Sequence, residues 1–285
     1  MNARIDGSAP PVLVTGGTGT LGRLVVARLR AAGCGVRVLS RRGRRGDEEG
    51  ADAAFVTGDL ATGEGIDAAV AGTEIIVHLA GSAKGDEVKT RHLVRAASRA
   101  GARHLVYISV VGAGRIPVVS AIDRAMFGYF AAKRAAEQVI ADASLPWTTL
   151  RATQFHDAAL LTVRQLARLP VLPVPAGFRF QPIDAGEVAA RLVELALGAP
   201  AGLVPDLGGP RVYELADLVR SYLRATHRHR PILPVWTPGG AARALRAGAN
   251  LAPDRAVGHR TWEDFLAGQL SSPTDSSAPA VRSFG

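Results

Sequence analysis

A tyrosine and a lysine stand four residues apart in the stretch GYFAAKRAAEQ, residues 128–138. The alanine-rich stretch reads as a helix, and residues four apart lie on one helical face, about 5–6 Å apart at Cβ. Tyr129 and Lys133 could act together in proton transfer, because a neighbouring ammonium favours the phenolate and lowers the phenol pKa from about 10. The alternative is an ordinary amphipathic helix that carries a tyrosine, and the pair alone does not decide.

A glycine-rich segment near the start, VLVTGGTGTLGRLVVARL (12–29), follows a strand pattern and opens a helix pattern. Glycines at such a turn let the backbone approach a pyrophosphate and let the helix pack against the strand. The helix start also offers free N–H groups and a partial positive charge to an anion. The segment therefore predicts a dinucleotide-binding turn rather than a merely structural one, with contacts from Gly16, Thr18, Gly19, Thr20, Leu21 and Gly22.

The end of the second predicted strand indicates which dinucleotide is bound. An acidic residue at this place would accept the ribose 2′-hydroxyl of NAD, but this chain has Ser40, Arg41 and Arg42. Hydroxyl and guanidinium groups can instead bind a 2′-phosphate, so NADP(H) is favoured and Arg41 and Arg42 are the expected contacts. The alternative is a solvated surface loop, which is what we expect of Arg44 and Arg45.

The elements around these residues predict an α/β fold. Continuous apolar strands alternate with helical patterns, which is typical of a parallel sheet covered on both faces, a Rossmann-type doubly wound sheet. We expect this NADP-binding domain over residues 10–150, a smaller substrate-binding lobe over 151–270 and a disordered Pro- and Ser-rich tail over 271–285. The expected strands are residues 11–15, 36–40, 53–57, 74–80, 104–109 and 147–152, and the expected helices are 21–33, 87–101, 184–197 with Asp184 as N-cap, 214–225 and 261–270.

Composition excludes several classes of protein. The chain of 285 residues is 47% hydrophobic and 21% charged, as in globular proteins, and Cys34 is its one cysteine, which fits a reducing cytoplasm. We expect no secretory signal and no membrane partner, because no apolar run approaches the roughly 20 residues that a spanning helix needs. We also expect no metal site. The net charge of +9 comes almost wholly from dispersed arginines without a nucleic-acid motif, so we expect no nucleic-acid partner and interpret HRHR (227–230) as a solvated run.

The chain resembles the short-chain dehydrogenase/reductase superfamily in five motifs that follow the family's order. They are TGGTGTLG (15–22), GDL (58–60), VHLAG (77–81), HLVYIS (104–109) and YFAAK (129–133). Two later segments, residues 144–157 and 180–189, resemble the atypical, NmrA-like group of NAD(P)-binding proteins, so that the similarity covers roughly residues 10–270.

The resemblance implies roles for several residues. Asp59 and Leu60 would line the adenine, although Asp59 could instead cap a turn. Ala80 and Gly81 would pass close to the ribose. Lys133 would hold the nicotinamide ribose, and Tyr129 would donate a proton to a carbonyl oxygen as hydride arrives.

The remaining catalytic positions depart from the family's pattern. Val110 stands where the family usually has its serine, and Ser109 comes one residue early, on the opposite face of a strand. Asp86 stands where the asparagine is usual. These departures leave open whether Tyr129 is the catalytic acid or a packed aromatic below the cofactor.

An insertion and two polar residues suggest where substrate binds. After RIP (115–117), the stretch VVSAIDRAMFG (118–128) is longer than in atypical relatives, and the spacing of its apolar residues, Met126 among them, predicts a short apolar lid or an insertion without function. Gln154 and His156 follow the sixth strand, where this fold binds ligands, although a lone histidine is more often structural. We take Ser109, Met126, Gln154 and His156 as candidate substrate contacts.

These features together favour an NADPH-dependent ketoreductase that acts on a bulky apolar substrate. The missing serine, the insertion and the arginine-rich composition resemble the angucyclinone ketoreductases of the simocyclinone type, within aromatic polyketide biosynthesis. A substrate phenol beside the carbonyl could then stabilise the developing charge. The alternatives are an NmrA-like redox-sensing regulator that binds a dinucleotide without turnover, and an NAD(P)-dependent epimerase or dehydratase.

Overall fold

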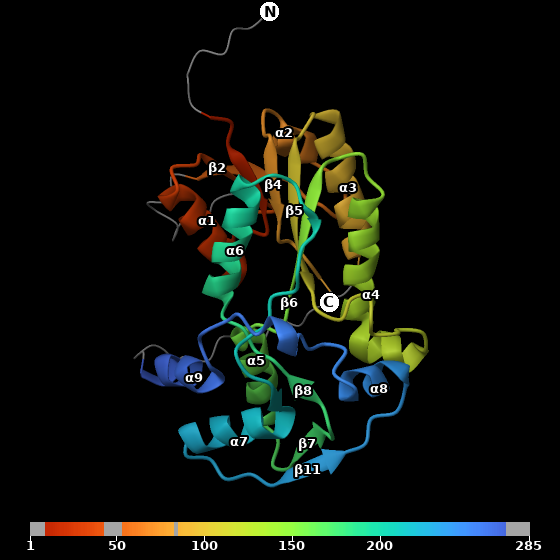
Figure 1. The fold of residues 1–285 in the computed structure, drawn as a ribbon, viewed down its shortest axis with the longest axis vertical. Coiled ribbons are helices and arrows are strands. Elements are labelled where there is room, and N and C mark those ends of the chain that lie inside the picture. Colours follow the sequence, from red (N-terminus) through yellow and green to blue (C-terminus); the bar gives the residue numbers. More distant parts are fainter. Residues whose placement is uncertain (1–8, 43–52, 83–84, 272–285) are drawn as a thin grey trace, which may run out of the picture.

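A parallel β-sheet forms the upper half of the molecule in the computed structural model, which describes residues 9–42, 53–82 and 85–271 (Figure 1). Its seven strands run in the order β3-β2-β1-β4-β5-β6-β9, and all neighbouring strands in it pair in parallel. The strands are β1 (Val12–Thr15), β2 (Val36–Ser40), β3 (Ala54–Thr57), β4 (Ile75–His78), β5 (His104–Val110), β6 (Trp147–Ala152) and β9 (Gly202–Leu203).

Helices cover both faces of this sheet (Figure 1). One core lies between the sheet and the helices α1 (Thr20–Ala31) and α6 (Ala185–Leu197). A second core lies between the opposite face and the helices α2 (Ile66–Val70), α3 (Asp86–Arg99) and α4 (Ala121–Ala141). This arrangement confirms the predicted Rossmann-type α/β fold.

The lower half of the molecule has an apolar core of its own, centred on side chains such as Val163, Leu218 and Trp262. Two small two-stranded sheets complete it, β7 with β11 in parallel and β8 with β10 antiparallel. Its elements are α5 (His156–Leu166), β7 (Leu172–Pro175), β8 (Arg179–Phe180), β10 (Tyr213–Glu214), α7 (Leu215–Ala225), β11 (Ile232–Val235), α8 (Gly240–Arg246), the 3-10 helix η2 (Pro253–Arg255) and α9 (Trp262–Ser271).

The chain passes between the two halves more than once. Helix α6 and strand β9 follow residue 150, yet α6 packs against α1 and β9 pairs with β6 at the edge of the large sheet. The expected division into residues 10–150 and 151–270 therefore does not hold for these two elements. Their apolar side chains belong to the sheet, because Val188, Leu192 and Ala196 complete the core over α1.

Several local expectations agree with the structure. The helices predicted at 21–33, 87–101, 184–197, 214–225 and 261–270 are present within two residues at each end. Asp184 caps α6, because its Oδ1 accepts hydrogen bonds from the backbone N–H groups of Gly186 and Glu187. None of the described helices is long and apolar enough to cross a membrane. The predictions for Arg44, Arg45 and residues 272–285 concern residues outside the described part of the chain.

The inserted stretch after residue 117 is not a separate lid. It forms the first turns of α4, a continuous helix of 21 residues. Ser120 begins this helix with a reciprocal cap, in which its hydroxyl accepts from the Asp123 N–H and the Asp123 carboxylate accepts from the Ser120 N–H. The same carboxylate accepts from the N–H of Ala241 on α8, which ties this end of α4 to the lower lobe.

Candidate cofactor and active site

The glycine turn after β1 has no room for side chains at three of its positions, one of which is Gly17, where a Cβ would lie 2.8 Å from Cγ1 of Val38. A Cβ on Gly22 would lie 2.1 Å from the Gly16 carbonyl oxygen, and one on Gly16, whose φ is +71°, would lie 2.7 Å from the backbone nitrogen of Ala80. Gly19 differs, because a Cβ there would meet only the Gly16 carbonyl oxygen, at 3.4 Å. Gly16 and Gly22 hold the turn closed, whereas Gly19 faces open space where a ligand can approach the backbone.

The start of α1 is suited to an anion. Gly19 is its N-cap, no side chain caps it, and its first turn contains no acidic residue. The N–H groups of this turn and the positive end of the helix dipole are thus available to a phosphate. The residues present therefore fit the diphosphate of a dinucleotide, and the predicted contacts Thr18, Thr20 and Leu21 lie in this turn.

The residues predicted for the adenosine half lie at the ends of β2 and β3. Ser40 ends β2, and Arg41 and Arg42 follow it with exposed side chains. Asp59 caps a turn, because its Oδ1 accepts from the backbone N–H of Ala61 at 2.8 Å, and Leu60 is buried. The turn-capping alternative for Asp59 is thus present, and contact with adenine stays a prediction.

The Lys133 ammonium is buried near the end of β4, within a group of polar contacts that we call the Lys133 cage. The ammonium donates to the Tyr107 hydroxyl at 3.1 Å and to the Ile108 carbonyl oxygen at 3.2 Å, and it lies 3.5 Å from Oδ2 of Asp86. A Cβ on Gly81 would lie 2.8 Å from this ammonium, so Gly81 passes directly over it. Burial lowers the pKa of Lys133, and the Asp86 carboxylate opposes that effect.

A row of buried polar side chains crosses the sheet next to this cage. Strand register places Thr15 beside His78, His78 beside Tyr107 and Tyr107 beside Thr149. His78 bonds the hydroxyl oxygens of Thr15 at 2.7 Å and of Thr90 at 3.2 Å, and its ring stacks on Tyr107 at 5.3 Å. Burial, followed by the charges of Lys133 and Lys89, lowers the pKa of His78 to about 3, so this histidine is neutral.

Tyr129 lies near Lys133 but is not activated by it. The ammonium is 5.8 Å from the centre of the Tyr129 ring, and the Tyr129 side chain is 41% exposed. Desolvation by surrounding protein atoms and the charge of Asp86 raise the pKa of Tyr129 to about 12. The sequence-based expectation of a lowered phenol pKa is wrong here, because desolvation first, and the nearby Asp86 carboxylate second, disfavour the charged phenolate.

Ser109 lies on the Lys133 side of the sheet. It is two residues after Tyr107 on β5, so the two side chains share a face, whereas Val110 points to the other face. The Ser109 hydroxyl is buried and has no hydrogen-bond partner among the described residues. Ser109 therefore remains a candidate for polar contact with a ligand, despite its displacement from the family position.

The N-terminal half of α4 carries exposed apolar side chains on the same helical face as the buried Lys133. Ile122, Met126, Tyr129 and Lys133 follow one another at intervals of four and three residues, which places them on a single face of the helix. Lys133 is buried against the sheet, but Ile122 is 54% and Met126 51% exposed. This face of α4 continues past the carboxyl edge of the sheet, where parallel α/β folds bind their ligands.

The other two predicted substrate contacts have structural roles. His156 is fully buried at the start of α5 and stacks on Phe265 at 4.9 Å and on Trp262 at 6.2 Å, so it does not face a ligand. The Gln154 amide bridges the halves, donating to the Asn250 carbonyl oxygen and accepting from the Gln181 N–H. No cluster of metal-binding side chains occurs among the described residues.

Tyr107, His78 and Thr90 were not singled out from the sequence. The available signal was a polar residue at an inward position of each apolar strand, at Thr15, His78 and Tyr107. Which helix residue each would meet depends on tertiary packing.

Comparison with known proteins agrees with this geometry. Residues 16–196 match the NAD(P)H-binding family, and the match spans the glycine turn, Gly81 and Lys133. The chain belongs to this family. Membership confirms a nicotinamide dinucleotide as the expected class of cofactor.

Two curated relatives in sequence are named as reductases. One is the (4-alkanoyl-5-oxo-2,5-dihydrofuran-3-yl)methyl phosphate reductase of Streptomyces griseus, 32% identical over 149 residues, or 52% of this chain and 49% of that protein. The other is the ceramide reductase of Caulobacter vibrioides, 33% identical over 208 residues, or 68% of this chain and 63% of that protein. This chain thus spans about half the length of the first relative and 63% of the length of the second.

Solved structures support the fold. The NADPH complex of a quinone oxidoreductase from Escherichia coli has a TM-score of 0.75 at 17% identity, covering 91% of this chain and 100% of that one. The UDP-glucose 4-epimerase of Thermus thermophilus, in complex with NAD, has a TM-score of 0.68 at 19% identity, covering 93% of this chain and 100% of that one. At these identities the likeness establishes the shared fold.

Proposed function

We propose that this protein is an NADPH-dependent reductase that transfers hydride to a carbonyl group of a bulky, apolar small molecule. The observation that carries the substrate class is the exposed apolar face of α4, where Ile122 and Met126 extend the face that bears Tyr129 and Lys133. Two relatives named as reductases support the reaction class. The finer proposal is a ketoreductase of aromatic polyketides, similar to the angucyclinone ketoreductases of the simocyclinone type.

In this proposal, one set of residues binds the cofactor and another group supplies the proton. Bound NADPH would supply a hydride from C4 of its nicotinamide ring to the carbonyl carbon. Gly19 and the first turn of α1 hold the diphosphate, and Lys133, fixed by Tyr107 and Asp86, is placed to hold the nicotinamide ribose. The carbonyl oxygen takes a proton as the alcohol forms, either from the Tyr129 hydroxyl or from a phenol of the substrate itself.

The substrate class is tested by removing the apolar face without changing the fold. Because both side chains are exposed, the double variant Ile122→Ser/Met126→Ser is expected to fold normally and to raise KM for polycyclic ketones about tenfold or more, with kcat nearly unchanged. Leu197→Ser, at an exposed apolar position at the end of α6, is the matched control. Equal KM values for the double variant and the native protein would remove this face from the binding site.

The proton donor is tested by Tyr129→Phe. A loss of 10²-fold or more in kcat, with unchanged affinity for NADPH, would assign the proton to Tyr129. An unaffected kcat would favour a substrate phenol, which agrees with the raised pKa of Tyr129. Comparing ketones with and without a neighbouring phenol separates these two outcomes.

One observation favours a second candidate function. A phenol with a pKa of about 12 and a valine at the usual serine position would suit a protein that binds a dinucleotide without turning it over, as an NmrA-like redox sensor does. A panel of quinones and polycyclic ketones, assayed by NADPH oxidation, separates the candidates. Tight NADPH binding without oxidation across the panel would favour the sensor.

A further inference from the structure

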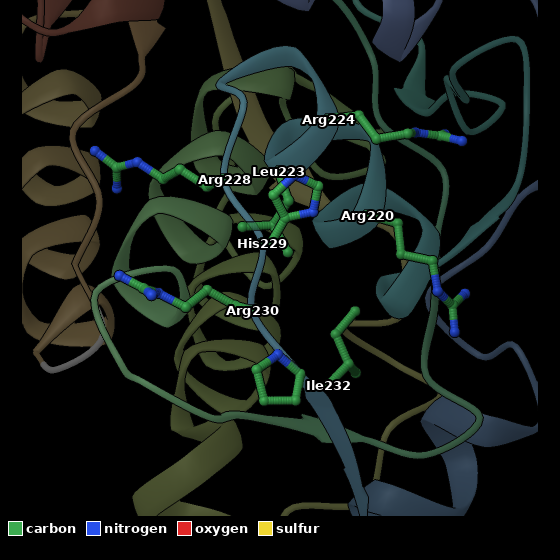
Figure 2. A pocket seen from close by; sticks show the side chains of 8 residues that line it. Arg220, Leu223, Arg224, Arg228, His229, Arg230 and Ile232 are labelled. Carbon is green, nitrogen blue, oxygen red and sulfur yellow. The ribbon is translucent and has the colours of Figure 1, made fainter.

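The lower half of the molecule ends in a hollow in which four of the eight lining residues are arginines (Figure 2). It has a volume of about 550 Å³ and lies between the second half of α7 and the segment that leads into β11. Its lining residues are Arg220, Leu223, Arg224, Arg228, His229, Arg230, Pro231 and Ile232. We call this region, together with the exposed apolar residues Val171 and Leu233 beside it, the lobe tip.

The positive charge at the lobe tip is mostly unpaired. Arg220 pairs with Asp217 at 2.7 Å. Arg224, Arg228 and Arg230 are exposed, and none of the three forms an ion pair with another residue in the described ranges. Three guanidinium groups close in sequence thus remain free for an external anion.

The directions of these side chains argue against a single small anion. Figure 2 shows Arg228 and Arg230 extending to one side of the hollow and Arg220 and Arg224 to the other, with His229 between them. Guanidinium groups that bind one phosphate would converge on it in bidentate geometry. Diverging groups instead suit an extended anionic surface.

Apolar side chains lie next to these charges. The backbone N–H of Leu172 donates to the Pro231 carbonyl oxygen at 2.9 Å, so Val171 lies beside the arginine segment. Leu233 pairs in register with Pro173 on the outer face of the small sheet. Val171 is 44% and Leu233 53% exposed, and Trp236, just past the end of β11, is 72% exposed.

We propose that the lobe tip docks on an anionic phospholipid membrane. Arginines attract such a surface electrostatically, and aliphatic and indole groups gain by entering its interfacial layer. A nucleic acid would pair with the arginines equally well, but its phosphate backbone offers little to Val171 and Leu233. The expectation of no membrane partner was based on the lack of a spanning segment, which does not bear on a peripheral contact.

Vesicle sedimentation tests the proposal independently of any reductase activity. The full chain is mixed with vesicles of phosphatidylcholine alone or with 30% phosphatidylglycerol added. We expect binding only to the anionic vesicles, and loss of that binding at about 0.5 M salt, where charges are screened over a few ångströms. Arg224→Glu/Arg228→Glu/Arg230→Glu is expected to weaken binding more than about tenfold, and Val171→Ser/Leu233→Ser to weaken it at unchanged net charge.

The matched control carries the same charge change at the opposite end of the molecule. Arg95→Glu/Arg99→Glu/Arg103→Glu alters exposed residues on α3 and just beyond it, and it is expected to bind anionic vesicles nearly as well as the native protein. Circular dichroism confirms that each variant is folded. Equal loss in both triple variants, or equal binding to both vesicle types, would overturn the proposal. Binding to a 20-base-pair duplex DNA without binding to vesicles would overturn it in favour of a nucleic acid.

Discussion

The Lys133 ammonium and the Asp86 carboxylate form an ion pair at 3.5 Å, with side chains only 4% and 2% exposed. Because this pair is buried, the positive charge of the Lys133 ammonium is balanced by a carboxylate within the protein. Desolvation, together with the charge of Asp86, raises the pKa of Tyr129, on the neighbouring turn of α4, to about 12. The pair fixes the position of the Lys133 ammonium, and its carboxylate adds to the desolvation that raises the pKa of Tyr129.

Removing one partner of this pair should be costly. Asp86→Ala leaves a buried ammonium without its carboxylate, and we expect a loss of about 3 kcal/mol in the free energy of unfolding. Glu74→Ala, which breaks the exposed ion pair with Arg103, should cost about 1 kcal/mol or less. Urea denaturation of the two variants measures the difference, and similar losses would show that burial does not strengthen the Lys133–Asp86 pair.

The open position in the glycine turn separates cofactor binding from folding. Gly19→Ala adds a methyl group that meets only one backbone oxygen, so the protein should fold normally but bind NADPH at least about tenfold more weakly. Gly35→Ala, whose Cβ would make ordinary contacts with Pro11 at 3.7 Å, should bind NADPH like the native protein. Calorimetric titration provides the affinities. Native affinity in Gly19→Ala would place the diphosphate elsewhere.

The proposed preference for NADPH over NADH should depend on the two arginines after β2. Arg41→Ala/Arg42→Ala removes the groups proposed to contact the 2′-phosphate, so affinity for NADPH should fall about tenfold or more while affinity for NADH stays the same. Titrating both cofactors against native and variant protein checks this. A parallel loss for the two cofactors would indicate a general electrostatic effect.

The buried histidine of α5 should make the fold sensitive to acid. Burial lowers the pKa of His156 to about 4, below its unfolded value of 6.5, so the unfolded chain takes up a proton first as the pH falls. The stability linked to this group is complete above about pH 6.5 and is lost as the pH falls toward 4. The loss amounts to about 1.4 kcal/mol per pH unit within that window.

Replacing the ring with an apolar one isolates this effect. His156→Phe keeps a flat side chain against Phe265 and should reduce the slope of unfolding free energy against pH between 6.5 and 4.5. His259→Phe, at an exposed position, is the control and should leave the slope as it was. Urea denaturation at a series of pH values measures both slopes, and a native slope in His156→Phe would contradict the assignment.

Features encoded in one continuous stretch of sequence were predictable. The glycine turn, the capped helix at Asp184 and the Tyr129–Lys133 spacing depend on local geometry, and the structure contains each of them. The alternation of strands and helices likewise gave the correct fold class.

Features that depend on register and packing were not predictable. Tyr107 reaches Lys133 only because β5 lies beneath α4, and Asp86 reaches it from the start of α3. His156 is a candidate ligand contact because it follows a strand, but the structural alternative applies, since α9 returns to cover it with Trp262 and Phe265. The upward shift of the Tyr129 pKa also depends on packing, because it arises first from desolvation and second from Asp86, which is distant in sequence but close in space.

The return of α6 and β9 to the large sheet limits how this protein can be divided. An excised fragment ending at residue 150 would lack the helix that packs on β4 and β5, and the side chains of Val77, Val106 and Ile108 would lose that cover. The lower half of the molecule is therefore not a unit that can be exchanged at a single junction. A chimera with a related protein needs at least three crossovers, one before α5 and one on each side of α6, so that the helix stays with its own sheet.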